Sequence, residues 1–311
     1  MQRVLPLLVV CVFLSIGVAN ACDFSQRGTS QTCTLTVGGV TRQYLLYIPA
    51  DLPAAPSLLI YLHGANGGLY EGQNNGWTTK AGKVGFIAAY PQALPNDSGI
   101  TSWNLYFNHS FTNPPDDVGF IKSLIGAVEL GLAVDHRKVF VTGYSLGAFM
   151  ANRVGVELGN VVAAIAPVAG ELWQSVGGPV PHPVAPVSVL MMNGSADASV
   201  PYCGLTTPYP EATEDDTFNY WQTHDLCKQN TAALCSGGKP SATTSKTATG
   251  CSSSVEVQQY QLVGGIHEWY TVNMNVPPGT STQPYNSKFT TSTGLATDDI
   301  IWDFFAAHPK P

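Results

Sequence analysis

The sequence has few charged residues and no run of basic ones. Asp, Glu, Lys and Arg together make up 11% of the 311 residues, whereas a typical globular chain carries about a quarter. The 14 Lys and Arg are outnumbered by 21 Asp and Glu, which gives a formal net charge of −7. A protein that binds nucleic acid or an anionic membrane through surface charge needs a basic patch. We therefore expect neither nucleic acid nor a membrane as a partner of the mature chain.

Long apolar segments are also scarce. The only candidate, residues 4–18, is shorter than the roughly 20 residues of a membrane-spanning helix. It follows Arg3 and precedes an Ala-Asn-Ala sequence at residues 19–21, which matches a signal peptidase site. We therefore predict a secretory signal peptide over residues 1–21 and a secreted, extracellular mature chain. An uncleaved N-terminal anchor and a lipoprotein cut before Cys22 are the alternatives.

Cysteine is uncommon, but its number is informative. Cleavage after residue 21 would remove one of the seven cysteines and leave an even number. In an oxidising compartment an even number is typical of disulfides, and no C-x-x-C or close Cys/His pairing indicates a metal site. We therefore predict structural disulfides and no metal, with the pairing left open. The remaining cysteines are Cys22, Cys33, Cys203, Cys227, Cys235 and Cys251.

Short apolar runs alternate with segments of helical spacing along the chain. Hydrophobic residues make up 44% of it, enough for a sizeable core. This alternation predicts an α/β fold, with a mostly parallel sheet and helices on both faces, as one domain over residues 22–311. The predicted strands are a hairpin over residues 34–48 and runs at 57–62, 86–90, 139–142, 163–168, 187–192 and 255–262. The predicted helices are 117–131, 145–158, 214–226 and 298–307, and the low-complexity residues 236–254 and the Pro/Thr/Ser/Asn-rich residues 273–295 are predicted to be irregular surface segments.

Residues 143–147 read Gly-Tyr-Ser-Leu-Gly, directly after an apolar run and directly before a helical pattern. A G-x-S-x-G sequence in that position is typical of a nucleophile elbow, a sharp turn between a strand and a helix. Glycine flanks the serine because the neighbouring backbone leaves no room for a Cβ atom. The turn also directs the helix N-terminus toward developing negative charge. We predict Ser145 as a nucleophile; an ordinary glycine-rich turn is the alternative.

A serine nucleophile needs a base and an acid, and in α/β-hydrolases these follow it in the order acid, then histidine. Of the histidines after Ser145, His267 begins a loop just after a predicted strand, whereas His224 lies in a predicted helix and His308 near the C-terminus. Asp197 also stands in a loop that follows a predicted strand. Loops beyond the ends of parallel strands are where such folds hold catalytic groups. The predicted triad is therefore Ser145, Asp197 and His267.

An oxyanion in this reaction needs two backbone N–H donors. One is expected at Leu146, the residue after the nucleophile. The other is expected at Ala65, in a loop whose residues 63–68 read His-Gly-Ala-Asn-Gly-Gly and resemble an HG-type oxyanion loop. His63 precedes the nucleophile in the chain, so we expect it to support this loop through hydrogen bonds and not to act as the base.

Two tryptophans, Trp103 and Trp269, are candidates for substrate contact because they flank the predicted cleft. An aromatic ring there can stack on a phenolic acyl group or pack on an alkyl polyester. Packing in the core is the alternative.

These motifs together resemble the secreted esterase family that includes polyhydroxybutyrate depolymerases and feruloyl esterases of carbohydrate esterase family 1. The matching stretches, in the family's order, are residues 61–64, 85–91, 102–104, 116–121, 138–147, 164–169, 193–202 and 264–269. The resemblance implies the α/β-hydrolase fold and a carboxylic ester hydrolase that works through an acyl-enzyme, with the same triad and no cofactor. It also implies three disulfides: Cys22 with Cys33, Cys203 with Cys235, and Cys227 with Cys251.

The chain departs from the family beside the predicted catalytic centre. Ala65 stands where a cysteine is common, and residues 267–271 read His-Glu-Trp-Tyr-Thr where the family often has H-T-W-P-G. Feruloyl esters of plant cell-wall polysaccharide are the first predicted substrate, because no polymer-binding module is recognised. Polyhydroxybutyrate, another polyester and acetylxylan are alternatives. A catalytically inactive α/β-hydrolase that only binds its ligand would have lost a triad residue, whereas all three are present.

Overall fold

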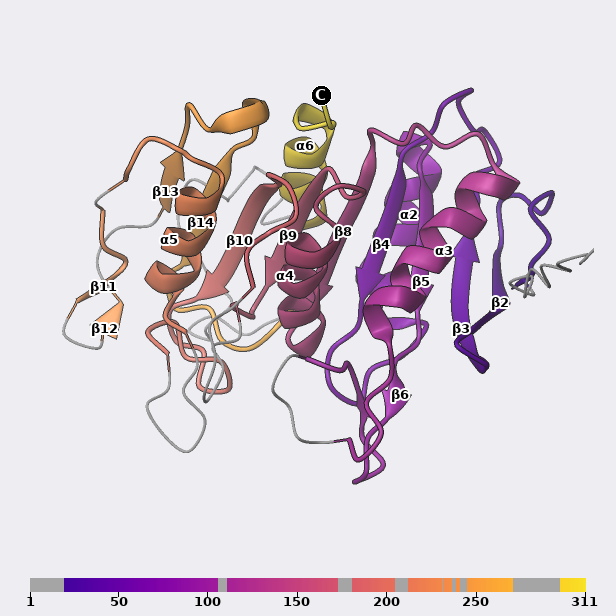
Figure 1. The fold of residues 1–311 in the computed structure, drawn as a ribbon, viewed down its shortest axis with the longest axis horizontal. Helices are drawn as coiled ribbons and strands as arrows, with labels where there is room; N and C mark the ends of the chain where they lie inside the picture. The colour runs from indigo at the N-terminus through magenta and orange to yellow at the C-terminus, as the bar shows by residue number, and fades with distance from the viewer. Residues whose placement is uncertain are drawn as a thin grey trace, which may run out of the picture.

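The structure is a computed structural model that describes residues 20–105, 111–172, 181–204, 212–230, 232–236, 239–240, 245–270 and 297–311. One large sheet has helices on both of its faces (Figure 1). Its strand order is β1-β2-β3-β5-β4-β8-β9-β10-β14-β13. The predicted sheet with helices on both faces is confirmed.

The central strands run parallel, as the continuous apolar runs predicted. They are β5 (Ile87–Pro91), β4 (Leu58–Leu62), β8 (Val139–Tyr144), β9 (Ala164–Val168), β10 (Ser188–Gly194) and β14 (Val257–Leu262). Every residue of β4, β5, β9 and β10 is buried, because helices cover both faces. Antiparallel strands complete the two edges: β1 (Asn20–Ala21), β2 (Ser30–Val37), β3 (Val40–Tyr47) and, at the far edge, β13 (Ser245–Ala248).

Each face of the sheet has its own apolar cluster, which packs between the sheet and the helices on that face. On one face lie α3 (Asp117–Gly131), α4 (Leu146–Leu158) and α5 (Glu214–His224), and on the other α2 (Trp77–Val84) and α6 (Thr297–Ala307) (Figure 1). Phe120 and Trp221 belong to the first cluster, and Trp77 and Phe305 to the second. No helix within the described residues is both long enough and apolar enough to cross a membrane.

Short elements connect these layers. They are α1 (Glu71–Asn74), the 3₁₀ turn η1 (Ser252–Ser254), the pair β6 (Leu94–Pro95) with β7 (Thr101–Ser102), and the pair β11 (Cys235–Ser236) with β12 (Lys239–Pro240). Neither α1 nor α2 was predicted, because α1 is a single turn and glycine flanks α2 at both ends. The residues that α2 buries, Trp77, Lys80 and Ala81, nevertheless follow helical spacing, so the prediction overlooked a signal that the sequence contains.

The prediction of an irregular surface segment over residues 236–254 is wrong for β13, which pairs antiparallel with β14. Lys246 and Ala248 alternate with less buried residues, as a half-buried strand requires. The partner strand therefore decides the structure of a segment whose composition alone favours a loop. Residues 1–19 of the predicted signal peptide and the predicted irregular residues 273–295 lie outside the described residues, while Asn20 and Ala21 pair with β2.

The disulfides lie in two parts of the fold. Cys22 pairs with Cys33 beside the first strands. Cys203 pairs with Cys235, and Cys227 pairs with Cys251, around α5 and the far edge of the sheet. This is the pairing that the family resemblance implied.

Candidate active site

Ser145 stands in the sharp turn between β8 and α4. Its backbone has φ 54° and ψ −124°, a conformation that residues with a side chain rarely adopt and that costs about 1–3 kcal/mol. A Cβ atom on Gly143 would lie 2.3 Å from the carbonyl oxygen of Gly147, and one on Gly147 would lie 2.0 Å from the carbonyl oxygen of Leu62. Both positions next to the turn therefore require glycine, for the steric reason that the motif suggested.

The side chains of Ser145, His267 and Asp197 form a continuous hydrogen-bonded chain. His267 Nε2 lies 2.8 Å from Ser145 Oγ, and His267 Nδ1 lies 2.7 Å from Asp197 Oδ2. The other carboxylate oxygen of Asp197 accepts the backbone N–H groups of Ser199 and Val200, each at 2.8 Å. The Asp197 side chain is almost fully buried, whereas that of His267 is 21% exposed. Asp197 is therefore held in place by several hydrogen bonds, and His267 remains within reach of solvent.

The chain brings these residues together because β8, β10 and β14 are parallel and end at the same edge of the sheet. Two further contacts, which the sequence reasoning did not identify, tie the loops at this edge. The hydroxyl of Tyr144 donates to the carbonyl oxygen of His267 at 3.0 Å. Ser195 Oγ accepts the N–H of Gly264 at 2.9 Å, which joins the loop of the acid to that of the histidine. Tyr144 and Ser195 stand next to motifs that the sequence analysis recognised, and this proximity was the only sequence signal for their contacts.

The two predicted oxyanion donors, Leu146 and Ala65, both lie near Ser145. Leu146 is the first residue of α4, where a backbone N–H has no partner within the helix. Ala65 follows Gly64, and a Cβ atom on Gly64 would lie 3.4 Å from the Cβ of Ser145, so this loop abuts the nucleophile. Among the described residues, no acceptor pairs with the N–H of Ala65 or of Leu146. Both groups are available to a ligand.

His63 is buried beneath this loop, with 1% of its surface exposed. Its Nδ1 lies 2.7 Å from the carbonyl oxygen of Gly64, and its Nε2 lies 3.0 Å from the backbone nitrogen of Ala93. Since a carbonyl accepts and an N–H donates, Nδ1 carries the proton and Nε2 accepts. Burial lowers the pKa of His63 to about 4, so the ring is neutral at ordinary pH. The hydrogen bonds expected of His63 are present.

Glu71, at the start of α1, reaches the same loop. Its Oε1 accepts the N–H of Gly64 at 2.9 Å and the hydroxyl of Tyr61 at 3.0 Å. That hydroxyl in turn accepts from Nδ2 of Asn75 at 2.7 Å. Burial raises the pKa of the Glu71 carboxyl. Sequence reasoning missed Glu71 because it belongs to no motif and its helix is a single turn.

Neither tryptophan proposed for substrate contact is placed to make one. Trp103 is fully buried, and its Nε1 donates to the carbonyl oxygen of His63 at 2.8 Å. Trp269 is 6% exposed, with its ring edge-on to those of Tyr61 and Trp77 at 5.3 and 6.3 Å. The prediction of direct substrate contact is therefore wrong for both, because core packing takes up both rings. Sequence alone cannot separate an exposed from a buried tryptophan.

A groove of about 650 Å³ runs beside the loop that carries Ala65. Most of its polar lining consists of amide side chains, and Tyr70 is 55% exposed there. The lining residues are Asn66, Gly67, Gly68, Leu69, Tyr70, Glu71, Asn74, Asn75 and Gln92. Asn75 and Gln92 already bond to neighbouring groups, whereas Asn66 and Asn74 are exposed and lie in the same lining as Tyr70.

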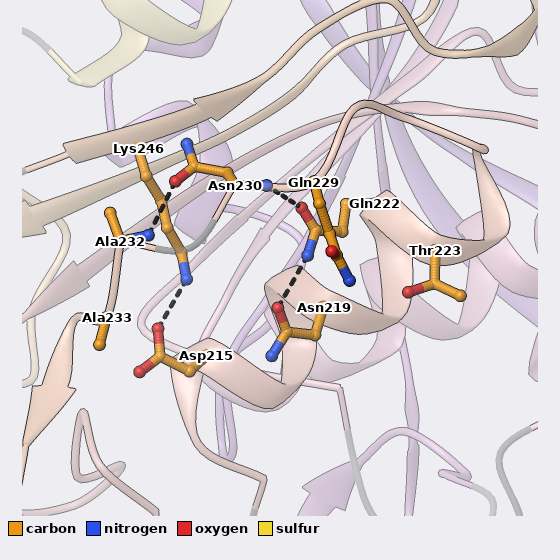
Figure 2. A pocket seen from close by; sticks show the side chains of 9 residues that line it. All are labelled: Asp215, Asn219, Gln222, Thr223, Gln229, Asn230, Ala232, Ala233 and Lys246. Atoms are coloured by element: carbon orange, nitrogen blue, oxygen red, sulfur yellow. Dashed lines mark hydrogen bonds and ion pairs between the residues drawn. The ribbon is translucent and has the colours of Figure 1, made fainter.

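Figure 2 shows a second hollow, of about 360 Å³, on α5 and the segments that follow it. Its polar groups are largely bonded to one another. Lys246 Nζ lies 2.6 Å from Asp215, and Gln222 donates to Asn219 and accepts from Asn230 (Figure 2). None of the predicted site residues lines this hollow. Because these polar groups bond to one another, we interpret the hollow as a structural feature and not as a ligand site.

Known proteins similar to this chain are esterases. No protein-family model matches it. NocK of Nocardia uniformis subsp. tsuyamanensis, which is assigned as an esterase, is 27% identical over 303 residues, 89% of this chain and 82% of NocK. Feruloyl esterase B of Piromyces equi is 31% identical over 153 residues, 49% of this chain and 28% of that enzyme. Poly(3-hydroxyalkanoate) depolymerase C of Paucimonas lemoignei is 27% identical over 128 residues, 41% of this chain and 31% of the depolymerase. The chain thus spans less than a third of the last two proteins.

Solved structures show the same fold over nearly the whole chain. The acetyl xylan esterase from Aspergillus awamori superposes with a TM-score of 0.52 at 16% identity, over 93% of this chain and 99% of the esterase. An S-formylglutathione hydrolase from Agrobacterium tumefaciens superposes with a TM-score of 0.52 at 11% identity, over 81% of this chain and 92% of the hydrolase. At these identities the likeness establishes the fold alone, which is the predicted α/β-hydrolase fold.

The α/β-hydrolase fold, with Ser145 in the sharp turn between β8 and α4, defines the structural class of the protein. Within that class, the relatives confirm the predicted resemblance to the esterases and the prediction of a carboxylic ester hydrolase.

Proposed function

We propose that this chain is a serine esterase in which Ser145, His267 and Asp197 form the catalytic triad. The observation that carries the proposal is their hydrogen-bonded chain, at 2.8 and 2.7 Å. His267 Nε2 takes the proton of Ser145 Oγ as that oxygen attacks the ester carbonyl. Asp197 keeps the Nδ1–H of the imidazole directed toward itself and stabilises the imidazolium that forms.

The negative oxygen of the tetrahedral intermediate is then bound by the N–H groups of Leu146 and Ala65. The C–O bond to the alcohol breaks, His267 returns its proton to the leaving oxygen, and the acyl group stays on Ser145. A water molecule attacks this acyl-enzyme with His267 again as base, which releases the acid and restores the hydroxyl of Ser145. The chemistry needs no cofactor.

Esters of plant cell-wall polysaccharide, feruloyl esters first, are the proposed substrates. The groove beside Ala65 supports a hydroxyl-rich alcohol part, because the exposed amides of Asn66 and Asn74 can pair with sugar hydroxyls and Tyr70 can pack on a sugar ring. An aliphatic polyester offers few partners for such amides. The similarity to feruloyl esterase B supports the same substrate class. With Trp103 in the core, the ferulate ring has no assigned stacking partner.

Export of the mature chain is part of the proposal. The apolar residues 4–18 followed by an Ala-Asn-Ala sequence favour a secretory signal peptide. Three disulfides in a chain of this length are typical of an oxidising, extracellular environment.

The test is hydrolysis by the purified mature chain of p-nitrophenyl acetate, feruloylated arabinoxylan, acetylated xylan and polyhydroxybutyrate. We expect turnover of p-nitrophenyl acetate and release of ferulate from the polysaccharide. Ser145→Ala should lower kcat/KM by about 10⁴-fold or more while the thermal unfolding midpoint stays close to that of the wild type. Turnover of no ester at all would favour an inactive binding protein, and near-wild-type activity of Ser145→Ala would overturn the triad. Hydrolysis of the polyester alone would overturn the proposed substrate class.

A further inference from the structure

The orientation of the loop at Ala65 is set by the contacts of a single peptide group. The carbonyl oxygen of Gly64 accepts from Nδ1 of His63 at 2.7 Å and from the N–H of Gly67 at 3.0 Å. Since a trans peptide places its C=O and N–H on opposite sides, these two bonds turn the N–H of Ala65 away from His63. The N–H of Gly64 belongs to the preceding peptide group, and it donates to Glu71 Oε1 at 2.9 Å.

The peptide on the N-terminal side of Gly64 is held at both of its polar groups, since Trp103 donates to the carbonyl oxygen of His63 and Glu71 accepts the N–H of Gly64. On the C-terminal side, the ring of His63 and the N–H of Gly67 restrain the carbonyl oxygen. Gly64 has no side chain that could hold it by packing, and a Cβ atom there would lie 3.2 Å from the ring of Tyr144. Glu71 is itself fixed by the Tyr61 hydroxyl, and through it by Asn75. A hydrogen bond to a carboxylate is stronger than one to a neutral acceptor, so this contact can hold a backbone segment in place.

We propose that Glu71 is a positioning residue that holds the Gly64–Ala65 segment in the orientation in which the Ala65 N–H meets the oxyanion. The inference rests on the proposed function, and Glu71 acts through the backbone of Gly64 without touching the reacting atoms. Loss of its carboxylate leaves the Gly64 N–H without an acceptor and loosens the peptide that carries the Ala65 N–H. The effect falls on the transition state, because only there does the oxygen carry full negative charge.

The test compares Glu71→Ala with Glu71→Gln on p-nitrophenyl acetate, a substrate too small to need the groove. Removal of a whole oxyanion donor lowers kcat by about 10²–10³-fold, so a misplaced donor should lower kcat of Glu71→Ala by about 10- to 100-fold, with KM within about threefold. Glu71→Gln keeps an acceptor oxygen at the same place and should retain kcat within about fivefold. Glu129→Ala, which removes a carboxylate from α3, is the matched control and should behave as the wild type.

Phenylboronic acid provides a readout that a merely structural role would not move, since its tetrahedral adduct with a serine mimics the oxyanion. Its inhibition constant should rise in Glu71→Ala in proportion to the loss of kcat. Tyr61→Phe, which removes the other donor to Glu71 Oε1 but leaves the Gly64 contact, should lose less activity than Glu71→Ala. An equal loss in Tyr61→Phe would assign the effect to the buried Tyr61–Glu71 pair and overturn the inference. Wild-type kcat and boronate inhibition in Glu71→Ala would also overturn it.

Labelling with a fluorophosphonate separates this inference from the proposed function. A wild-type protein that is not labelled at Ser145 would contradict the triad itself. Stoichiometric labelling of wild type and of Glu71→Ala at Ser145, together with an unchanged kcat in the variant, would leave the triad standing and reject the role of Glu71.

Discussion

Buried strands hold the chain around Ser145, whereas cross-links hold residues 203–251, which we term the cystine region. Around Ser145, every residue of β4 is buried, α4 buries most of its side chains, and no disulfide joins the residues that the structure describes there. The described part of the cystine region has two disulfides and the ion pair of Lys246 with Asp215 at 2.6 Å. Apolar strands that are covered on both faces are stabilised by burial of their side chains. A segment rich in Ser, Thr and Gly buries less apolar surface, so covalent and charged contacts offset the conformational entropy that it loses on folding.

This comparison predicts that small steric changes near Ser145 abolish activity, whereas changes in the cystine region lower stability and leave kcat intact. Around Ser145, backbone atoms of neighbouring segments are in van der Waals contact. An added methyl group therefore clashes with backbone atoms that cannot move aside. In the cystine region the two disulfides and the ion pair of Lys246 with Asp215 involve none of the three predicted triad residues.

Gly147→Ala should have the largest effect. The new methyl group would lie 2.0 Å from the carbonyl oxygen of Leu62, which belongs to a buried strand and cannot move aside. We expect a loss of more than about 100-fold in kcat/KM for p-nitrophenyl acetate and a loss of about 3 kcal/mol in the free energy of unfolding. Gly126→Ala is the control, because a Cβ atom on Gly126 in α3 meets nothing within 4 Å. A fully active Gly147→Ala would break the comparison.

Removing the disulfide between Cys227 and Cys251 should come next. The double variant Cys227→Ser/Cys251→Ser opens a link across 24 positions, and we expect the free energy of unfolding to fall by about 2–4 kcal/mol. Urea denaturation measures this loss, and kcat at 25 °C should stay within about twofold of the wild type. A matching loss of kcat in the folded variant would show that the cystine region supports the active site.

Lys246→Met should have a smaller effect on stability. The Lys246 side chain is 2% exposed and pairs with Asp215, but Asp215 keeps the backbone N–H groups of Leu234 and Cys235 as donors. We therefore expect a loss of about 2 kcal/mol in urea denaturation, with kcat unchanged. Lys122→Met, on the exposed side of α3, removes the same charge where it has no described partner and should be neutral. Equal losses in both variants would mean that the ion pair contributes nothing specific.

Asp225→Asn should change the pH dependence of stability, with the smallest effect. Burial raises the pKa of Asp225 to about 7, whereas in the unfolded chain it is about 3.9. Between these values the folded chain holds a proton that the unfolded chain has released, so the wild type loses stability as the pH rises through this window. Asp225→Asn removes that slope, and its stability relative to the wild type should rise by about 1.3 kcal/mol between pH 5 and pH 6 in urea denaturation. Parallel curves for the two proteins would contradict the buried, protonated state.

Local sequence patterns predicted much of the candidate site. The turn at Ser145 follows from glycines on both sides of a serine between a strand and a helix, and these features are neighbours in the chain. Asp197 and His267 followed from their places after predicted strands, since parallel strands place their carboxyl ends at one edge. Trp103 could not be assigned in this way, because a ring close to a site in sequence can point into the core as readily as toward solvent. Glu71 was missed since its partner, the N–H of Gly64, is a backbone group with no sequence signal.

By itself, the sequence determined the alternation of strands and helices, the position of the elbow and the order of the three residues around it. These depend on periodicity and on steric limits within a few neighbouring residues. Only the tertiary structure decided that Ser145 and His267, 122 positions apart, meet at 2.8 Å, that Trp103 is buried, that residues 245–248 complete the sheet, and that Glu71 accepts the N–H of Gly64. Each of these features requires segments that are distant in the chain to pack side by side. That packing is determined by how the chain as a whole buries its apolar surface.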